Sequence, residues 1–275
     1  TAIRSPPKVA RKMSSVDQQK LPEDSIKEIV NLFRNPKVGC VSGEKRIYQK
    51  ESETAAGAGE GIYWKYESFL KKLDAELYSV VGAAGELFAI RTELYREVEK
   101  DTLLDDFIIS LRIAMDGYTI QYNPNAYAIE TSSANVKEEL KRKVRIAAGG
   151  IQSVIRLKEL LNPFKYGVLS FQYISHRVLR WTLAPLFLPI IFLVNLFIAL
   201  SENFQLNSFY TITFFLQILF YIAALIGWFL ESKSIKIKVL FVPYYFFIMN
   251  LAMYLGFKRY LKKSQSVNWE RAKRA

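Results

Sequence analysis

The sequence contains few of the residues that build disulfide-linked or metal-bound scaffolds. Its 275 residues include one cysteine, Cys40, and one histidine, His176. A single cysteine excludes an internal disulfide, and this pair is too small to form a zinc site from cysteine and histidine. Cys40 lies in an alternating apolar run at 38–41, which favours a small buried residue over a reactive thiol.

The N-terminal segment lacks an apolar core. Residues 1–20 are basic and polar, so they do not resemble a secretory signal peptide. We expect this segment to be disordered and unrelated to the sequence that follows.

Charge is absent from three long stretches in the second half of the chain. The uncharged runs are 181–200, 208–230 and 239–257, the last of which carries Pro243. Each is about as long as a helix that crosses a hydrocarbon core. The sequence therefore predicts a membrane region at 181–257, and three successive apolar runs argue against buried helices of a soluble protein.

The distribution of basic residues predicts the orientation. The loop 201–207 has no Lys or Arg, whereas the loop 231–238 carries three lysines, so the second loop and the soluble domain are expected inside. The tail at 258–275 holds seven basic residues and one acid, although three full crossings would place it outside. We expect a cytoplasmic tail, with a bend at Pro243 that keeps the third run from crossing fully.

The net charge of +12 indicates anionic partners. Together with the apolar runs, it favours membrane lipid and phosphorylated ligands over nucleic acid. Just before the first run, residues 163–180 interleave aromatic and polar side chains, which predicts a helix in the membrane interface with Arg177 and Arg180 at the level of the headgroups.

Residues 21–162 are mixed and periodic, as expected of a soluble domain. Strand patterns alternate with helix patterns, which predicts an α/β fold. The expected helices are 25–33, 63–77, 92–98, a helix opening at Asp105, and 136–161; the expected strands are 38–42, 45–48, 87–90, 118–123 and 126–130. The small, Gly-rich stretch 55–61 is expected to be a mobile loop, and Gly82-Ala83-Ala84-Gly85 a tight backbone element.

Two groups of charged residues are candidates for chemistry. Asp105 and Asp106 lie where a loop enters a helix, so they either cap that helix or supply an ionised base. Arg142 and Arg145 lie three residues apart on one helix face, and arginine binds phosphate oxygens bidentately. A solvated or lipid-facing basic surface is the alternative for the arginines.

The order of these motifs resembles the membrane-bound family-2 glycosyltransferases of the polysaccharide-synthase type, which have a GT-A fold. The resemblance covers about 22–275. The matching segments are Pro36–Glu44, Glu60–Glu67, Val81–Arg91, Leu104–Phe107 with Ser110–Arg112 and Gly117-Tyr118, Arg142–Ile146, and Ser175–Trp181.

The resemblance implies roles for particular residues. Asp106, next to Asp105, would be the base that deprotonates the acceptor hydroxyl. Gly82, Ala83 and Gly85 would line the acceptor site, and Arg142 and Arg145 would bind the diphosphate. A divalent metal, Mg or Mn, is expected; Asp17 is its only candidate ligand here. The reaction would be an inverting transfer from a nucleotide-diphosphate sugar to a polysaccharide or lipid-linked acceptor. The location would be a bacterial or archaeal plasma membrane, with the soluble domain cytoplasmic.

The sequence also departs from the family pattern. Arg142 and Ile146 stand where the polysaccharide synthases have Gln and Trp, which weakens the case for processive synthesis. Asp17 is followed by Gln18-Gln19 rather than by a second carboxylate, and the nucleotide-binding strands that open the fold are not recognisable. We therefore expect a partial GT-A domain, truncated at its N-terminus, that lacks the donor-binding half and is inactive unless complemented. A degenerate membrane protein that binds a glycan or a partner, and a basic scaffold on anionic lipid, remain alternatives.

Overall fold

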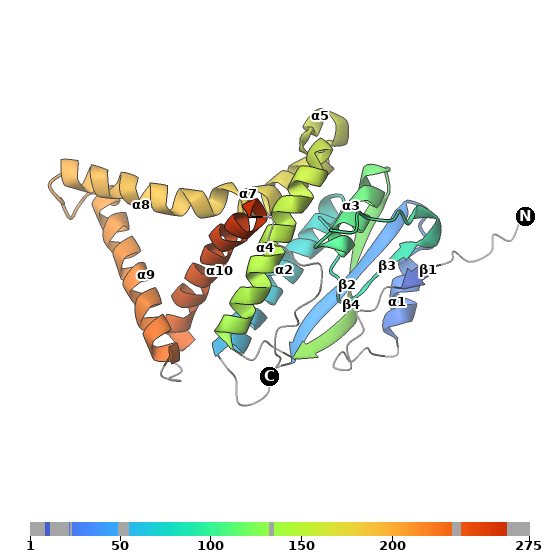
Figure 1. Ribbon diagram of the computed structural model, residues 1–275, viewed down its shortest axis with the longest axis horizontal. Coiled ribbons are helices and arrows are strands. Elements are labelled where there is room, and N and C mark those ends of the chain that lie inside the picture. Colours follow the sequence, from blue (N-terminus) through green and yellow to red (C-terminus); the bar gives the residue numbers. More distant parts are fainter. Residues whose placement is uncertain are drawn as a thin grey trace, which may run out of the picture.

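The computed structural model describes residues 9–11, 22, 24–48, 55–131, 135–232 and 238–262. An α/β domain lies on one side of the molecule and a group of long apolar helices on the other (Figure 1). The long helix α4, Val136–Arg156, runs along the boundary between them. The α/β fold class is as the sequence predicts.

A mixed sheet forms the centre of the α/β domain. Its strands are β1, Val9–Arg11; β2, Val38–Tyr48; β3, Phe88–Arg91; and β4, Thr119–Thr131. They lie in the order β1-β3-β2-β4. β2 and β4 are parallel, and β3 is antiparallel to both β1 and β2. The sheet therefore reverses direction at β3, between its two long parallel strands and the short edge strand β1.

Three details of the sheet differ from the sequence prediction. The strands expected at 118–123 and 126–130 form the single strand β4. Residues 9–11, within the segment expected to lack structure, pair with β3; the other residues of 1–20 lie outside the described ranges. The strands expected on either side of Gly43 form one strand with a register shift there. Gly43 is required because a Cβ would lie 2.6 Å from the carbonyl oxygen of Ala126 on the neighbouring strand.

Helix α1, Ser25–Leu32, covers one face of the sheet. The apolar residues on this face are Ile29, Phe33, Val38, Val41, Leu87, Ala89, Ala126 and Ala128. Arg91 ties the helix end to the sheet, because its guanidinium donates to the carbonyl oxygens of Phe33 and Val38, each at 2.8 Å. The predicted helix at 25–33 is thus confirmed to within one residue.

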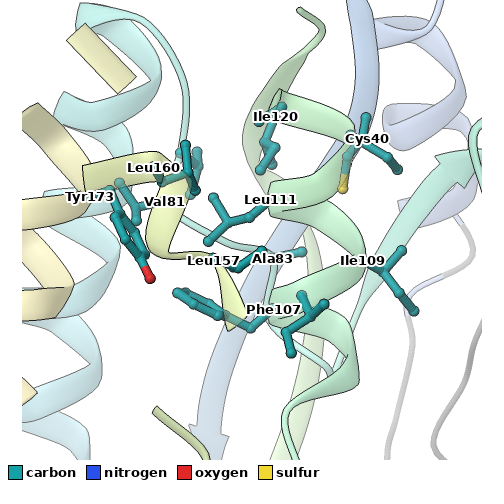
Figure 2. Packing of buried hydrophobic residues seen from close by; sticks show 14 of the residues in the cluster. Cys40, Val81, Ala83, Phe107, Ile109, Leu111, Ile120, Leu157, Leu160 and Tyr173 are labelled. Atoms are coloured by element: carbon teal, nitrogen blue, oxygen red, sulfur yellow. The ribbon is translucent and has the colours of Figure 1, made fainter. Parts of the chain in front are cut away.

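Helix α3, Asp105–Met115, covers the opposite face and forms the main core (Figure 2). Leu111 and Ile113 of α3 pack with Ile120 of β4 and Cys40 of β2, all of them buried. Burial raises the pKa of the Cys40 thiol. Cys40 is the small core residue that the sequence indicates, and it is no accessible nucleophile.

Helix α2, Ala55–Leu77, lies between the sheet and α4 and is longer than predicted. The loop expected at 55–61 is wrong: these residues are the first two turns of α2. The helix expected at 92–98 is also wrong, because only a single 3-10 turn, η1, Thr92–Leu94, is present.

The segment that leads to the apolar helices is broken into short pieces. After α4 come the 3-10 turn η2, Lys158–Leu161, and the helices α5, Pro163–Tyr166, and α6, Val168–Tyr173. A π turn, η3, Ile174–Val178, then joins α7, Leu179–Trp181. Gly167, at φ +52°, separates α5 from α6. The single helix expected at 163–180 is therefore a chain of four elements.

Three long helices complete the described chain: α8, Leu183–Ser201; α9, Phe209–Ser232; and α10, Lys238–Leu261. Each contains a stretch long and apolar enough to cross a membrane, at 183–201, 209–231 and 239–261. These agree closely with the predicted runs. α10 also packs against α4: Phe241, Tyr244, Tyr245 and Ile248 form a cluster with Val136.

Candidate functional site

The two candidate carboxylates, Asp105 and Asp106, occupy the first turn of α3. The N-cap residue is Leu104, which has no capping side chain, so neither aspartate is the cap. Both are half-buried. The positive end of the helix dipole favours the ionised carboxylate at this position.

The loop Gly82–Gly85 faces these aspartates and is held by backbone hydrogen bonds. The Ala83 amide donates to Ser110 Oγ of α3 at 2.9 Å, and the Ala84 amide donates to Ser42 Oγ of β2 at 3.3 Å. The two serines thus fix the loop between the sheet and α3. The predicted tight backbone element is confirmed.

Glycine allows a close approach at both ends of this loop. Gly82 has φ +85°, and a Cβ there would lie 2.2 Å from the ring of Phe107. A Cβ on Gly85 would lie 2.8 Å from Asp106 Oδ2. The Asp106 carboxylate therefore sits directly against the Gly85 backbone, and the loop and the candidate base form one site.

Helix α4 positions the loop that precedes Asp105. The Leu103 amide donates to Gln152 Oε1 at 3.1 Å, and Gln152 Nε2 donates to the Asp101 carbonyl at 3.0 Å. Gly149 allows close approach, since a Cβ there would lie 2.7 Å from Leu104. Gly149 and Gln152 follow Arg145 at helical spacing, so the three residues share one face of α4.

The two candidate arginines differ in their surroundings. Arg142 is bound by the buried Glu139 through Nε and Nη2, each at 2.8 Å. Arg145 is half-buried; burial, followed by the charges of Arg259 and Arg142, lowers its pKa, and the Asp106 carboxylate opposes this shift. The Asp106 charge thus acts on Arg145, whereas Glu139 orients Arg142.

The described residues do not provide a metal site. They contain no group of three or more His, Cys, Asp or Glu side chains that could hold a metal ion. Asp17 lies outside the described ranges. The donor set present here does not fit a divalent metal, so the expected Mg or Mn ion stays a prediction and no step of the reaction is derived through it.

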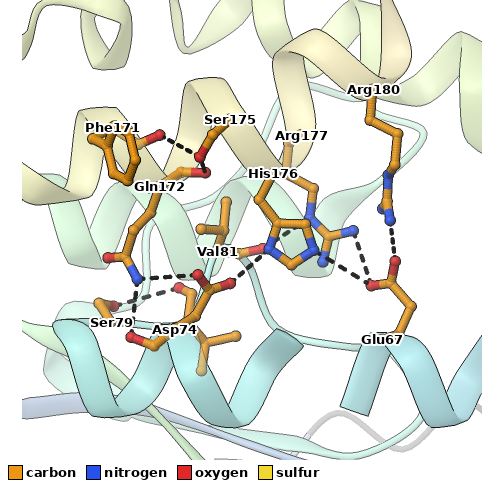
Figure 3. A network of polar contacts seen from close by, with 11 residues as sticks. Glu67, Asp74, Ser79, Val81, Phe171, Gln172, Ser175, His176, Arg177 and Arg180 are labelled. Atoms are coloured by element: carbon orange, nitrogen blue, oxygen red, sulfur yellow. Dashed lines mark hydrogen bonds and ion pairs between the residues drawn. The ribbon is translucent and has the colours of Figure 1, made fainter. Parts of the chain in front are cut away.

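Sequence reasoning missed a buried polar network beside this site (Figure 3). Arg177 and Arg180 both donate to the carboxylate of Glu67 on α2. His176 Nδ1 lies 2.6 Å from Asp74 Oδ2, further along α2. Arg177, which is predicted to lie at headgroup level, has an exposed fraction of 8% and bonds to the α/β domain, so its side chain points into the protein.

A polar stripe on α2 is the sequence feature that could have revealed this network. Trp64, Glu67, Ser68 and Lys71 recur at helical spacing, so they share one face of the helix. That face is turned inward, since Glu67 and Lys71 are buried. A polar inner face predicts charged partners elsewhere in the domain.

Comparison with known proteins agrees with this architecture. The solved structure of the mannosyltransferase PcManGT from Pyrobaculum calidifontis, in complex with GDP-Man and Mn2+, matches with a TM-score of 0.51 and 17% sequence identity. The match covers 89% of this chain and 59% of that chain, so this chain spans less than two thirds of the solved protein. At this identity the likeness shows the GT-A fold. A search of the curated proteins finds no match.

The sequence model described as Glycosyl transferase family group 2 matches residues 17–255. That range includes the Gly82–Gly85 loop, both aspartates, both arginines and nearly all of the three apolar helices. Because the match covers most of the chain and the fold agrees with it, this protein belongs to glycosyl transferase family group 2.

Proposed function

We propose that this chain carries the acceptor side of an inverting glycosyltransferase, with Asp106 as the general base. The observation that carries the proposal is the close contact between the Asp106 carboxylate and Gly85 of the Gly82–Gly85 loop. The charge of Asp106 also acts on Arg145. Glycines let an acceptor approach the backbone closely, and a carboxylate at a helix N-terminus stays ionised.

The proposed reaction transfers a hexosyl group from a nucleotide-diphosphate sugar to a glycan or lipid-linked acceptor. The acceptor oxygen forms a bond to the anomeric carbon while its proton passes to Asp106. The bond from that carbon to the phosphate oxygen breaks, and the nucleoside diphosphate leaves with the electron pair. Arg145, with Arg142 nearby, stabilises the negative charge on the departing diphosphate.

The site lies next to the apolar helices, which supports an acceptor that reaches it from the membrane. The three candidate spans indicate a membrane protein. We place the α/β domain on the cytoplasmic side, where nucleotide sugars are available and where the basic loop 231–238 is expected.

The test is transfer by the purified protein in lipid nanodiscs, followed as nucleoside diphosphate release, with NMR detection of the product anomer. Asp106→Asn should lower turnover by about 10²- to 10⁴-fold, the usual contribution of a general base, while leaving nucleotide binding intact. Asp116→Asn is the matched control, because Asp116 lies at the other end of α3 and pairs with Arg96. Equal and measurable turnover in wild type and Asp106→Asn would contradict the assignment, whereas no turnover in either protein would mean that the chain needs a complementing donor half.

A non-catalytic glycan-binding role is the second candidate. It is favoured by the missing metal ligands among the described residues. Calorimetric titration with uridine or guanosine diphosphate and manganese separates the two. Saturable, metal-dependent binding supports the transferase, whereas glycan binding with no nucleotide binding and no turnover supports the alternative.

A further inference from the structure

Arg177 touches both sides of the candidate site from a position just ahead of the first apolar helix. It lies in the π turn η3, six residues before α8 begins. Its Nε donates to the Val81 carbonyl at 3.2 Å, and Nη1 donates to Glu67 Oε2 at 3.2 Å. The guanidinium also lies 6.0 Å from the centre of the Phe107 ring and 5.9 Å from that of Trp181.

These contacts involve the immediate neighbours of the site residues. Val81 precedes Gly82, the first residue of the acceptor loop, and Phe107 follows Asp106. Phe107 in turn packs against Gly82 and stacks edge-on with Trp181 at 5.3 Å between ring centres. One guanidinium therefore contacts both the stretch of chain that enters the loop and the residue next to the base.

We propose that Arg177 is a positioning residue, which sets the Gly82–Gly85 loop against Asp106 and makes its geometry depend on the segment that leads into the membrane. This inference rests on the proposed function for the identity of the site. The positioning itself concerns a hydrogen bond that exists whether or not transfer takes place.

The segment that carries Arg177 is anchored to α2 at two places along one helix face. Near one end of the network, Gln172 Nε2 donates to the Asp74 carbonyl at 2.9 Å and His176 pairs with the Asp74 carboxylate. Toward the other end, the Glu67 carboxylate accepts hydrogen bonds from Arg177 and Arg180. Burial alone would raise the pKa of Glu67, but the two guanidiniums outweigh it and hold the pKa below its ordinary value. The Glu67 end of the anchor is thus a charged cluster, which fixes the place of Arg177.

Arginine is needed here because of its shape. A buried ion pair adds little net stability, so the value of this one is argued from its geometry. Lysine ends in one nitrogen, which can reach Glu67 but has no donor at the Nε position. Glutamine carries its amide nitrogen at the same place along the side chain as arginine Nε, but it lacks the charged fork. The two substitutions separate the loop contact from the ion pair.

The experiment is hydrogen exchange on the full chain in nanodiscs, comparing wild type, Arg177→Lys and Arg177→Gln. The reporters are the amides of Gly82, Ala83 and Ala84, which donate to Val80 O, Ser110 Oγ and Ser42 Oγ. We expect exchange at these amides to be about two- to tenfold faster in Arg177→Lys, as for the loss of one hydrogen bond, and close to wild type in Arg177→Gln. Arg180→Lys is the matched control, because Arg180 binds Glu67 but is not bonded to the loop, and it should leave the loop unchanged.

Kinetics provide the second readout. In an active preparation, Arg177→Lys should raise the KM for the acceptor and lower kcat without changing the KM for the nucleotide sugar. Faster loop exchange in Arg177→Gln together with wild-type exchange in Arg177→Lys would mean that Arg177 acts only through Glu67, and would overturn the proposal. So would a uniform rise in exchange over the whole domain. Because exchange needs no turnover, failure of the transferase assignment would leave this result readable.

Discussion

Gly85 has room for a hydrogen atom but not for a methyl group, because Asp106 Oδ2 lies 2.8 Å from the place of its Cβ. In Gly85→Ala the carboxylate tip must move away, which a flexible side chain can do at little cost. We expect the free energy of unfolding to fall by less than about 1 kcal/mol. Turnover should fall by about 10- to 100-fold, because a displacement of about 1 Å at a reacting group has that effect.

Gly117→Ala is the matched control for this prediction. Gly117 has φ +91°, and nothing lies within 4 Å of the place that a Cβ would take, so alanine there is strained but meets no neighbour. It should cost about 1–2 kcal/mol of stability and leave turnover unchanged. Thermal unfolding and nucleoside diphosphate release measure the two effects. Unchanged turnover in Gly85→Ala would show that Asp106 does not act against this loop.

At the scale of elements, one buried lysine links the strands of the sheet. Lys45 of β2 has a fully buried side chain, and its Nζ lies 2.7 Å from Glu86, just ahead of β3, and 2.7 Å from Glu130 of β4. Burial opposes ionisation of Glu86, but Lys45 outweighs it and lowers the pKa of Glu86 from 4.5 to about 2. The ionised carboxylate is therefore part of what joins these elements.

The pH dependence follows from the sign of that shift. Because the pKa of Glu86 is lower in the folded state, its contribution to stability is complete above about pH 4.5 and is lost as the pH falls toward 2. The free energies of unfolding of wild type and Glu86→Gln, measured by thermal unfolding, should differ by on the order of 3 kcal/mol near neutral pH. The two values should converge in acid. Glu93→Gln, which removes an exposed carboxylate, is the control for the loss of one negative charge. A difference that is independent of pH would contradict the prediction.

The elements that the sequence predicted well are those in which pattern and packing agree. The apolar spacing at 25–33 and the run that opens at Asp105 became α1 and α3, since each needs to bury one stripe against the sheet. The loop predicted at 55–61 was wrong. Its glycine content indicates a loop, but these residues are continuous with the rest of α2. Asp106 and Gly85 could be matched by resemblance to a family. Arg177 lies in the matching segment Ser175–Trp181, but its contacts could not be predicted. Basic residues before an apolar run indicate a membrane flank whether or not a distant helix carries an acid that pairs with them.

At the scale of the whole molecule, α10 is largely apolar, yet it packs against α4 at the edge of the α/β domain. Near its start, Tyr245 lies with its hydroxyl 3.4 Å from Glu139 of α4. Near its end, a Cβ on Gly256 would lie 2.4 Å from Ala147 Cβ and 3.0 Å from the α4 backbone. α4 also carries the exposed Lys137 and Lys141, which are costly to place in hydrocarbon. A helix in contact with α4 over this length cannot leave the polar side of the membrane altogether.

We therefore predict that the basic tail at 258–275 lies on the same side as the α/β domain, although three full crossings would put it on the other. The measurement is labelling of single-cysteine variants with a membrane-impermeant maleimide in intact and permeabilised cells. Gln205→Cys, in the exposed turn between α8 and α9, should react in intact cells, whereas Ser266→Cys and the exposed Lys100→Cys should react only after permeabilisation. Cys40 is fully buried and adds no background. Labelling of Ser266→Cys in intact cells would mean that α10 crosses the bilayer, and its contacts with α4 could not then persist in the membrane.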